Sequence, residues 1–181
     1  SASIGQGYNL VTPLQNASMI SAIANGGFLS KPYLVKKIED SEGKLIKEFP
    51  PKNLKNIEMD PEILKHLKEG LRGVVYEPHG TGHRARLKNI AVSGKTGTAQ
   101  VVGMKDSKDI DPEEKIPYSF RDHAWFVAFA PYENPDIAVS IIIEHGGHGG
   151  ETAAPIARKI MENYFIHYPP AKISENNLNI N

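Results

Sequence analysis

The most informative part of this sequence reads Val92-Ser93-Gly94-Lys95-Thr96-Gly97-Thr98-Ala99-Gln100. The run predicts one β-strand, on which successive side chains point to opposite faces, so Lys95 lies on one face while Thr96 and Thr98 share the other. Its glycines weaken a strand without adding packing, which indicates that a ligand or another backbone approaches closely. A cation and two hydroxyls on such a strand are typical of an anion-binding edge in an active site.

The segments around this run predict an antiparallel sheet between helical layers. A capping box at Thr12 and Gln15 starts a helix over 13–25, and Asp60-Pro61 starts a second amphipathic helix. Residues 33–40 and 44–49 read as a hairpin. Three strands (90–102, 123–130 and 137–144) and a closing helix at 153–165, with Pro155 in its first turn, complete the predicted elements.

Distinctive blocks of sequence accompany the Lys95 run along nearly the whole chain. They are Gly5-Gln6-Gly7-Tyr8, Thr12-Pro13-Leu14-Gln15, Ala24-Asn25-Gly26-Gly27, Arg121-Asp122-His123-Ala124-Trp125-Phe126, Ala128-Phe129-Ala130-Pro131, Glu144-His145-Gly146-Gly147-His148-Gly149-Gly150 and Ala153-Ala154-Pro155-Ile156-Ala157-Arg158.

Lys95-Thr96-Gly97 resembles the K-T-G element of penicillin-binding proteins and serine β-lactamases. Taken together, the blocks resemble the second half of a class B transpeptidase over about residues 3 to 167. The Asp122-His123 pair and the Gly-Gly-His-Gly-Gly segment resemble the penicillin-binding protein 2 group, the elongation-type peptidoglycan D,D-transpeptidases of rod-shaped bacteria.

The resemblance implies an α/β fold of the α+β type, incomplete in this chain. Residues 1–167 would form the C-terminal half of the transpeptidase domain, and 168–181 a polar tail. This half would supply three strands and the final helix of a five-stranded antiparallel sheet sandwiched between helices. An upstream half would supply the remaining strands and the nucleophile helix.

The resemblance also implies a serine acyl-enzyme mechanism that cross-links peptidoglycan stem peptides and is inhibited by β-lactams. Lys95, Thr96, Gly97 and Thr98 would bind substrate, and the backbone N–H of Thr98 would form half of the oxyanion hole. The nucleophilic serine and the S-x-N element would lie upstream, so this chain alone is predicted to be inactive. Two alternatives stay open: a D,D-carboxypeptidase or β-lactamase-like hydrolase, and a non-catalytic β-lactam sensor or docking module.

Three serines match parts of a catalytic pattern by chance. Ser41 and Lys44 fit S-x-x-K, but they fall in the predicted hairpin turn rather than at the start of a buried helix. Ser174 fits S-x-N within the polar tail. Ser93 shares a strand face with Lys95, yet such neighbours lie about 6 to 7 Å apart, beyond the reach of a general base.

Composition excludes several other functions. Lysine and arginine number 21 and aspartate and glutamate also number 21, so no net field attracts nucleic acid. There is no cysteine, which excludes disulfides and thiolate chemistry in this chain. Gly94-Lys95-Thr96 matches the end of a Walker A motif, but Asn89 stands where the first glycine is required, so nucleotide binding is not predicted. No cofactor or metal is predicted, since the candidate ligands match no strong site: His79, His83, Glu144, His145, His148 and Glu151.

The setting and the partners follow from the resemblance. No run reaches the length of a membrane span in this sequence, whereas family members face the periplasm from a single anchor in the inner membrane. Expected partners are the upstream half of the same protein, a rod-shape scaffold protein and a SEDS-type glycosyltransferase. The polar loop at 104–117 is expected either to border the acceptor side of the substrate groove or to be a solvated excursion.

Overall fold

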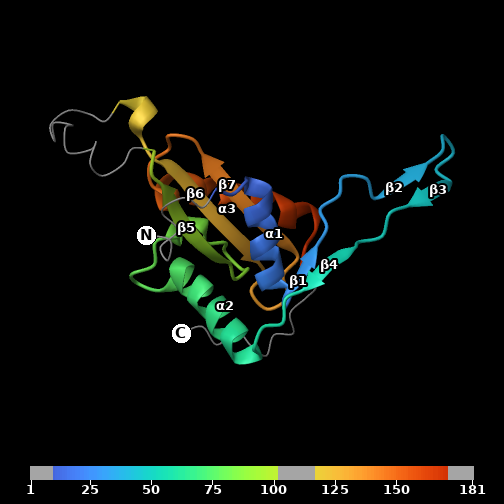
Figure 1. Cartoon of the computed structure of the whole chain (residues 1–181), viewed down its shortest axis with the longest axis horizontal. Helices are drawn as coiled ribbons and strands as arrows, with labels where there is room; N and C mark the ends of the chain where they lie inside the picture. The colour runs from blue at the N-terminus through green and yellow to red at the C-terminus, as the bar shows by residue number, and fades with distance from the viewer. Residues whose placement is uncertain (1–9, 102–116, 171–181) are drawn as a thin grey trace.

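The computed structural model describes residues 10–101 and 117–170 (Figure 1). Within them, a three-stranded antiparallel sheet is covered by helices on both faces, and a long two-stranded arm projects to one side. The first of the sequence blocks, nearly all of the loop at 104–117, and Ser174 with most of the tail lie outside the described residues.

The central sheet consists of β5 (Ser93–Ala99), β6 (His123–Ala130) and β7 (Ile137–Ile143), in the order β5-β6-β7. The register places Lys95 opposite Val127 and Thr98 opposite Ala124. The structure starts β5 three residues later than the predicted 90–102 and ends β7 one residue earlier than 144. Before β5, the carbonyl of Ala91 accepts a 2.9 Å hydrogen bond from the backbone N–H of Tyr132, which follows β6.

Each face of the sheet has its own helical cover, as Figure 1 shows. On one face, Phe126 and its small neighbours on β6 belong to the same buried cluster as Met161 of α3 (Gly149–His167). On the other, Phe129 packs with Ile20 of α1 (Pro13–Ala24) and Leu71 of α2 (Pro61–Tyr76). The predicted fold class, an antiparallel sheet sandwiched between helices, is confirmed.

The helix starts of α1 and α2 follow from their sequences. Thr12 and Gln15 form the predicted capping box, with the N–H of Thr12 donating to Gln15 Oε1 at 2.8 Å and the N–H of Gln15 donating to Thr12 Oγ1 at 3.2 Å. Asp60 Oδ1 accepts from the N–H of Glu62 at 2.8 Å, which caps α2.

The start of α3 was predicted wrongly. The helix begins at Gly149, four residues before the predicted 153, and Pro155 lies inside it rather than in its first turn. Glycine is a poor helix former, so the sequence gives no start signal there. The glycines are needed for close packing, because a Cβ on Gly149 would lie 2.0 Å from the carbonyl oxygen of Trp125.

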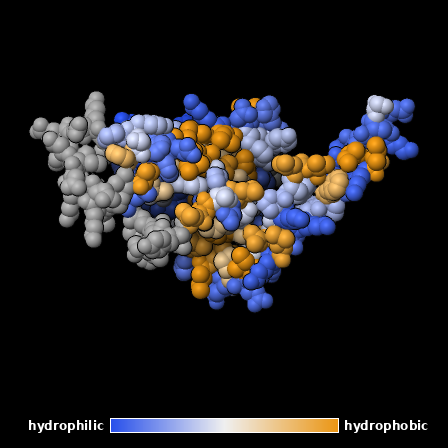
Figure 2. All heavy atoms as spheres, turned by 45° about the horizontal axis from the view of Figure 1, so that its top comes forward, coloured by the Kyte–Doolittle hydropathy of each residue, from blue (hydrophilic) through white to orange (hydrophobic). Residues whose placement is uncertain are grey.

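The arm is built from two short antiparallel pairs. At its base β1 (Phe28–Ser30) pairs with β4 (Asn53–Asn56), which the sequence did not predict, and beyond them β2 (Lys37–Glu39) pairs with β3 (Leu45–Glu48). The outer pair confirms the predicted hairpin with shorter strands. Figure 2 shows apolar side chains exposed along the arm. Leu34 and Ile46 are two of the exposed apolar residues of this segment.

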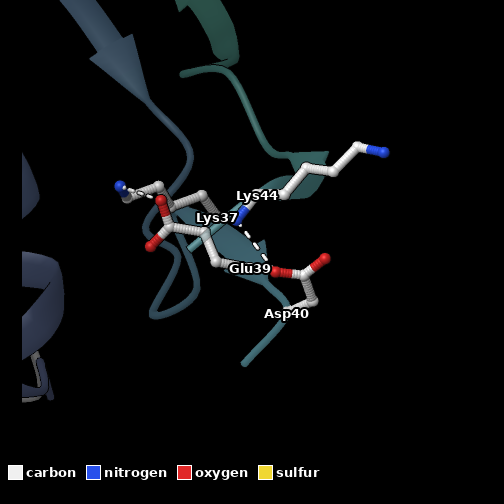
Figure 3. Close-up of polar contacts among 4 residues, drawn as sticks. All are labelled: Lys37, Glu39, Asp40 and Lys44. Atoms are coloured by element: carbon white, nitrogen blue, oxygen red, sulfur yellow. Dashed lines mark hydrogen bonds and ion pairs between the residues drawn. The ribbon is translucent and has the colours of Figure 1, made fainter. Parts of the chain in front are cut away.

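The S-x-x-K match lies in the exposed turn at the tip of this hairpin. Asp40 Oδ1 accepts from the N–H groups of Glu42 at 3.0 Å and Lys44 at 2.9 Å, and Gly43 takes a φ of +81°. Figure 3 shows the Asp40 carboxylate beside the backbone of Lys44, while the Lys44 side chain extends away. The turn chemistry accounts for these residue types without a catalytic role for Ser41.

Within the part of the chain that the structure describes, no helix combines the length and the apolar character that crossing a bilayer requires.

Candidate active site

The site forms along β5, whose only strand neighbour among the described residues is β6. One edge of β5 therefore has no strand partner in residues 10–101 and 117–170, and its backbone groups are open to a ligand or another segment. Lys95 lies on the sheet face that carries Val127, and its exposed Nζ donates to the carbonyl oxygen of Thr96 at 2.8 Å.

Thr96 and Thr98 lie on the opposite face of β5 and open into a hollow of about 480 Å³. The hollow lies between β5, the segment 80–84 and the beginning of α3. Lys95 is not among its lining residues, so the structure places the predicted cation and the predicted hydroxyls on two sides of one strand. The lining residues are Gly80, Thr81, His83, Arg84, Thr96, Thr98, His148, Gly149, Gly150 and Glu151.

Thr81 is one residue of this site that sequence reasoning missed, and Arg84 is another. Thr81 Oγ1 lies 2.7 Å from Thr96 Oγ1, although the two residues are 15 positions apart in the chain. Gly150 of α3 presses on the same turn, since a Cβ there would lie 2.2 Å from the carbonyl oxygen of Thr81 and 3.5 Å from Thr96 Cγ2. The only signal in the sequence was the Gly80-Thr81-Gly82 segment, which by itself reads as a turn.

Arg84 fixes the start of α3 at the other side of the hollow. Its Nη1 donates to the carbonyl oxygen of Glu151 at 3.1 Å. In an α-helix that carbonyl would accept from residue 155, but Pro155 has no N–H. Arg84 thus supplies the hydrogen bond that the proline removes, and it joins the segment 80–84 to the helix.

Comparison with known proteins places this chain in a family. The sequence profile of the penicillin binding protein transpeptidase domain matches residues 1–162. The chain belongs to the penicillin-binding protein transpeptidase family. It is 38% identical over 167 residues to the peptidoglycan D,D-transpeptidase MrdA of Haemophilus influenzae. The alignment covers 91% of this chain and 25% of that protein.

Solved structures of the same family agree with the fold. Penicillin-binding protein A from M. tuberculosis, in its ceftriaxone acyl-enzyme complex, aligns with a TM-score of 0.71 at 30% identity over 88% of this chain and 34% of the other. Pseudomonas aeruginosa PBP2 in complex with WCK 5153 aligns with a TM-score of 0.68 at 32% identity, over 91% of this chain and 32% of the other. The chain therefore spans about a quarter to a third of these relatives.

The Ser93 and Lys95 pair does not form a dyad in this member of the transpeptidase family. Ser93 is fully buried and its Oγ has no hydrogen-bond partner among the described residues. Lys95 Nζ donates instead to the backbone of Thr96. Ser93 therefore lacks the base that a nucleophile requires.

His123 and His145 make local hydrogen bonds. His123 Nδ1 accepts from the backbone N–H of His145 at 2.9 Å, and His145 Nδ1 lies 3.0 Å from the carbonyl oxygen of Arg121. A carbonyl only accepts, so His145 Nδ1 bears a hydrogen. His123 is thus a hydrogen-bonding residue at a strand end. Among residues 10–101 and 117–170, no three His, Asp or Glu side chains gather as a metal site would require.

Proposed function

We propose that this chain supplies the K-T-G half of a peptidoglycan D,D-transpeptidase of the penicillin-binding protein 2 kind. The observation that supports this most directly is the open edge of β5, where Thr96 and Thr98 face a hollow and Lys95 borders the other side. Relatives named peptidoglycan D,D-transpeptidase align with most of this chain. An acyl-enzyme complex of a relative supports a β-lactam-reactive site in the intact protein.

Recognition of the substrate carboxylate is assigned to the side chains of β5. The terminal carboxylate of a stem peptide, or the ring carboxylate of a β-lactam, accepts hydrogen bonds from Thr96 and Thr98 in the hollow. Lys95 contributes its positive charge from the other side of the strand, where it is exposed and able to reorient. Gly97 keeps the edge free of a side chain, and a Cβ there would also come within 3.2 Å of Trp125 Cβ.

The chemical step needs a serine from the upstream half. Its Oγ attacks the carbonyl carbon of the penultimate D-alanine, the peptide C–N bond breaks, and the terminal D-alanine leaves with a proton. The amine of a second stem peptide then attacks the ester, and the serine oxygen departs and regains a proton. The backbone N–H of Thr98 stabilises the oxyanion in both steps, together with a donor from the nucleophile segment.

The location and the partners of the intact protein follow from the same proposal. Its active site faces the periplasm, and an upstream segment anchors it in the inner membrane. It works with a SEDS-type glycosyltransferase and a rod-shape scaffold protein. Two rival activities differ in the acyl acceptor: a carboxypeptidase or β-lactamase passes the acyl group to water, and a sensor retains it.

Intact-mass spectrometry of the whole protein after incubation with a penicillin tests the proposal. We expect one acyl adduct on a peptide upstream of this chain, and none on residues 1–181. Supplying an amine acceptor with a stem-peptide donor should then give a cross-linked product. An adduct on Ser41 or Ser93 would contradict the assignment of the nucleophile. Exclusive hydrolysis would favour the carboxypeptidase alternative.

A further inference from the structure

We propose that Thr81 is a positioning residue for the reaction, and that it directs the hydroxyl hydrogen of Thr96 toward the substrate carboxylate. This inference rests on the proposed function, in which Thr96 recognises that carboxylate. It starts from the 2.7 Å contact between the Oγ1 atoms of Thr81 and Thr96, in which either oxygen is able to donate.

The number of hydrogens decides which direction of this hydrogen bond is productive. Each threonine hydroxyl has one hydrogen to donate, whereas a carboxylate only accepts. If Thr96 donates to Thr81, no hydrogen remains for the substrate. If Thr81 donates to Thr96, the Thr96 hydrogen is free to point into the hollow. When Thr81 donates to Thr96 and Thr96 donates to the carboxylate, each hydroxyl hydrogen has an acceptor. Hydrogen bonds linked in such a chain polarise and strengthen one another.

The backbone around Thr81 is held in place from two directions. Below it, the N–H of Gly82 donates to the carbonyl of Val74 at the end of α2, at 2.8 Å. A Cβ on Gly80 would lie 2.4 Å from that same carbonyl oxygen, so the turn sits directly on α2. Above it, Gly150 of α3 contacts the Thr81 carbonyl. Thr81 is therefore an exposed side chain on a fixed backbone, as a positioning residue needs to be.

The test compares acylation of the intact protein by benzylpenicillin and by its methyl ester, which lacks the carboxylate charge. T81V removes the hydroxyl at nearly constant volume, and T81S retains it. We expect T81V to lower the second-order acylation rate constant for benzylpenicillin by about 3- to 10-fold, the size of one neutral hydrogen bond. The ester rate should fall less, because an uncharged ester carbonyl is a weaker acceptor than a carboxylate. T81S should behave like the unmodified protein.

A matched control is T152V in α3. Thr152 Oγ1 donates to the carbonyl of His148 at 3.0 Å, so this variant also removes one threonine hydroxyl near the hollow, but it leaves the pair at Thr96 intact. We expect no change in either rate. The double variant T81V/T96V should be no slower with benzylpenicillin than T96V alone, because Thr81 acts only through Thr96.

Equal losses with both penicillins in T81V would show a general structural role and overturn the inference. An unchanged benzylpenicillin rate in T81V, while T96V loses rate selectively, would also overturn it and leave the role of Thr96 intact. If T96V shows no selective loss, then the proposed role of Thr96 is wrong, and the role of Thr81 is wrong with it.

Discussion

Arg84 donates a 3.1 Å hydrogen bond to the carbonyl oxygen of Glu151, the group that Pro155 leaves without its helical donor. A proline inside a helix usually kinks or ends it, at a cost of about 3 kcal/mol. Here the helix extends from Gly149 to His167, and part of that cost is offset from outside the helix. The arginine also ties the start of α3 to the segment that carries Thr81, on the rim of the candidate site.

Replacing Arg84 with Met should loosen the first turn of α3. The variant retains most of the aliphatic stem but leaves the Glu151 carbonyl without this donor, so we expect the local opening free energy to fall by about 1 kcal/mol. Amide hydrogen exchange of peptides covering 148–154 in the intact protein should then be about 5-fold faster. In a P155A background the helix recovers its own donor, and R84M should have a smaller effect. Equal effects in both backgrounds would contradict the explanation.

Gly150→Ala should damage both stability and acylation. The added Cβ would lie 2.2 Å from the Thr81 carbonyl oxygen, so the turn or the helix must shift. We expect a loss of about 2 kcal/mol or more in the opening free energy of α3, which exceeds the intrinsic gain from alanine. Hydrogen exchange and benzylpenicillin acylation measure the two effects.

Gly70→Ala in α2 is the matched control for that variant. Gly70 is a helical glycine whose Cβ would meet no atom within 4 Å. Its replacement should stabilise α2 by up to about 1 kcal/mol and leave acylation unchanged. If G150A and G70A behave alike, the close approach of α3 to the Thr81 turn does not matter to the site.

Lys95→Met should slow acylation by carboxylate-bearing β-lactams. Lys95 does not line the hollow and acts through its positive charge rather than through a direct hydrogen bond, so the expected loss is about 1 kcal/mol, or roughly 5-fold in the rate constant. The measurement is stopped-flow acylation of the intact protein. A change of less than 2-fold in the acylation rate constant would show that Lys95 does not contribute to recognition of the carboxylate.

The variants S41A and K44M test whether the S-x-x-K match at Ser41 and Lys44 provides the nucleophile and its base. Both residues lie in the exposed turn of the β2–β3 hairpin, where Asp40 and Gly43 provide the stabilising contacts. We expect acylation and the position of the adduct to be unchanged in both variants. Loss of the adduct in S41A would instead identify Ser41 as the nucleophile.

Local chemistry in the sequence predicted most of the secondary structure. The capping box at Thr12 and the glycine turn at Gly43 are formed by residues that are neighbours in the chain, so their hydrogen bonds are readable from spacing alone. The alternation along β5 correctly separated Lys95 from Thr96 and Thr98. The start of α3 was missed, because its glycines are selected by contact with Trp125 and Thr81, not by helix propensity.

The sequence by itself determined the family, the strand that bears Lys95 and the hydroxyls that face the hollow, because these depend on motif and on strand periodicity. Only the tertiary structure decided that Thr81 contacts Thr96 and that Arg84 replaces the N–H missing at Pro155. Both contacts join segments that lie far apart in the chain. Their partners are set by how α2, β5 and α3 pack together, and no local pattern records that geometry.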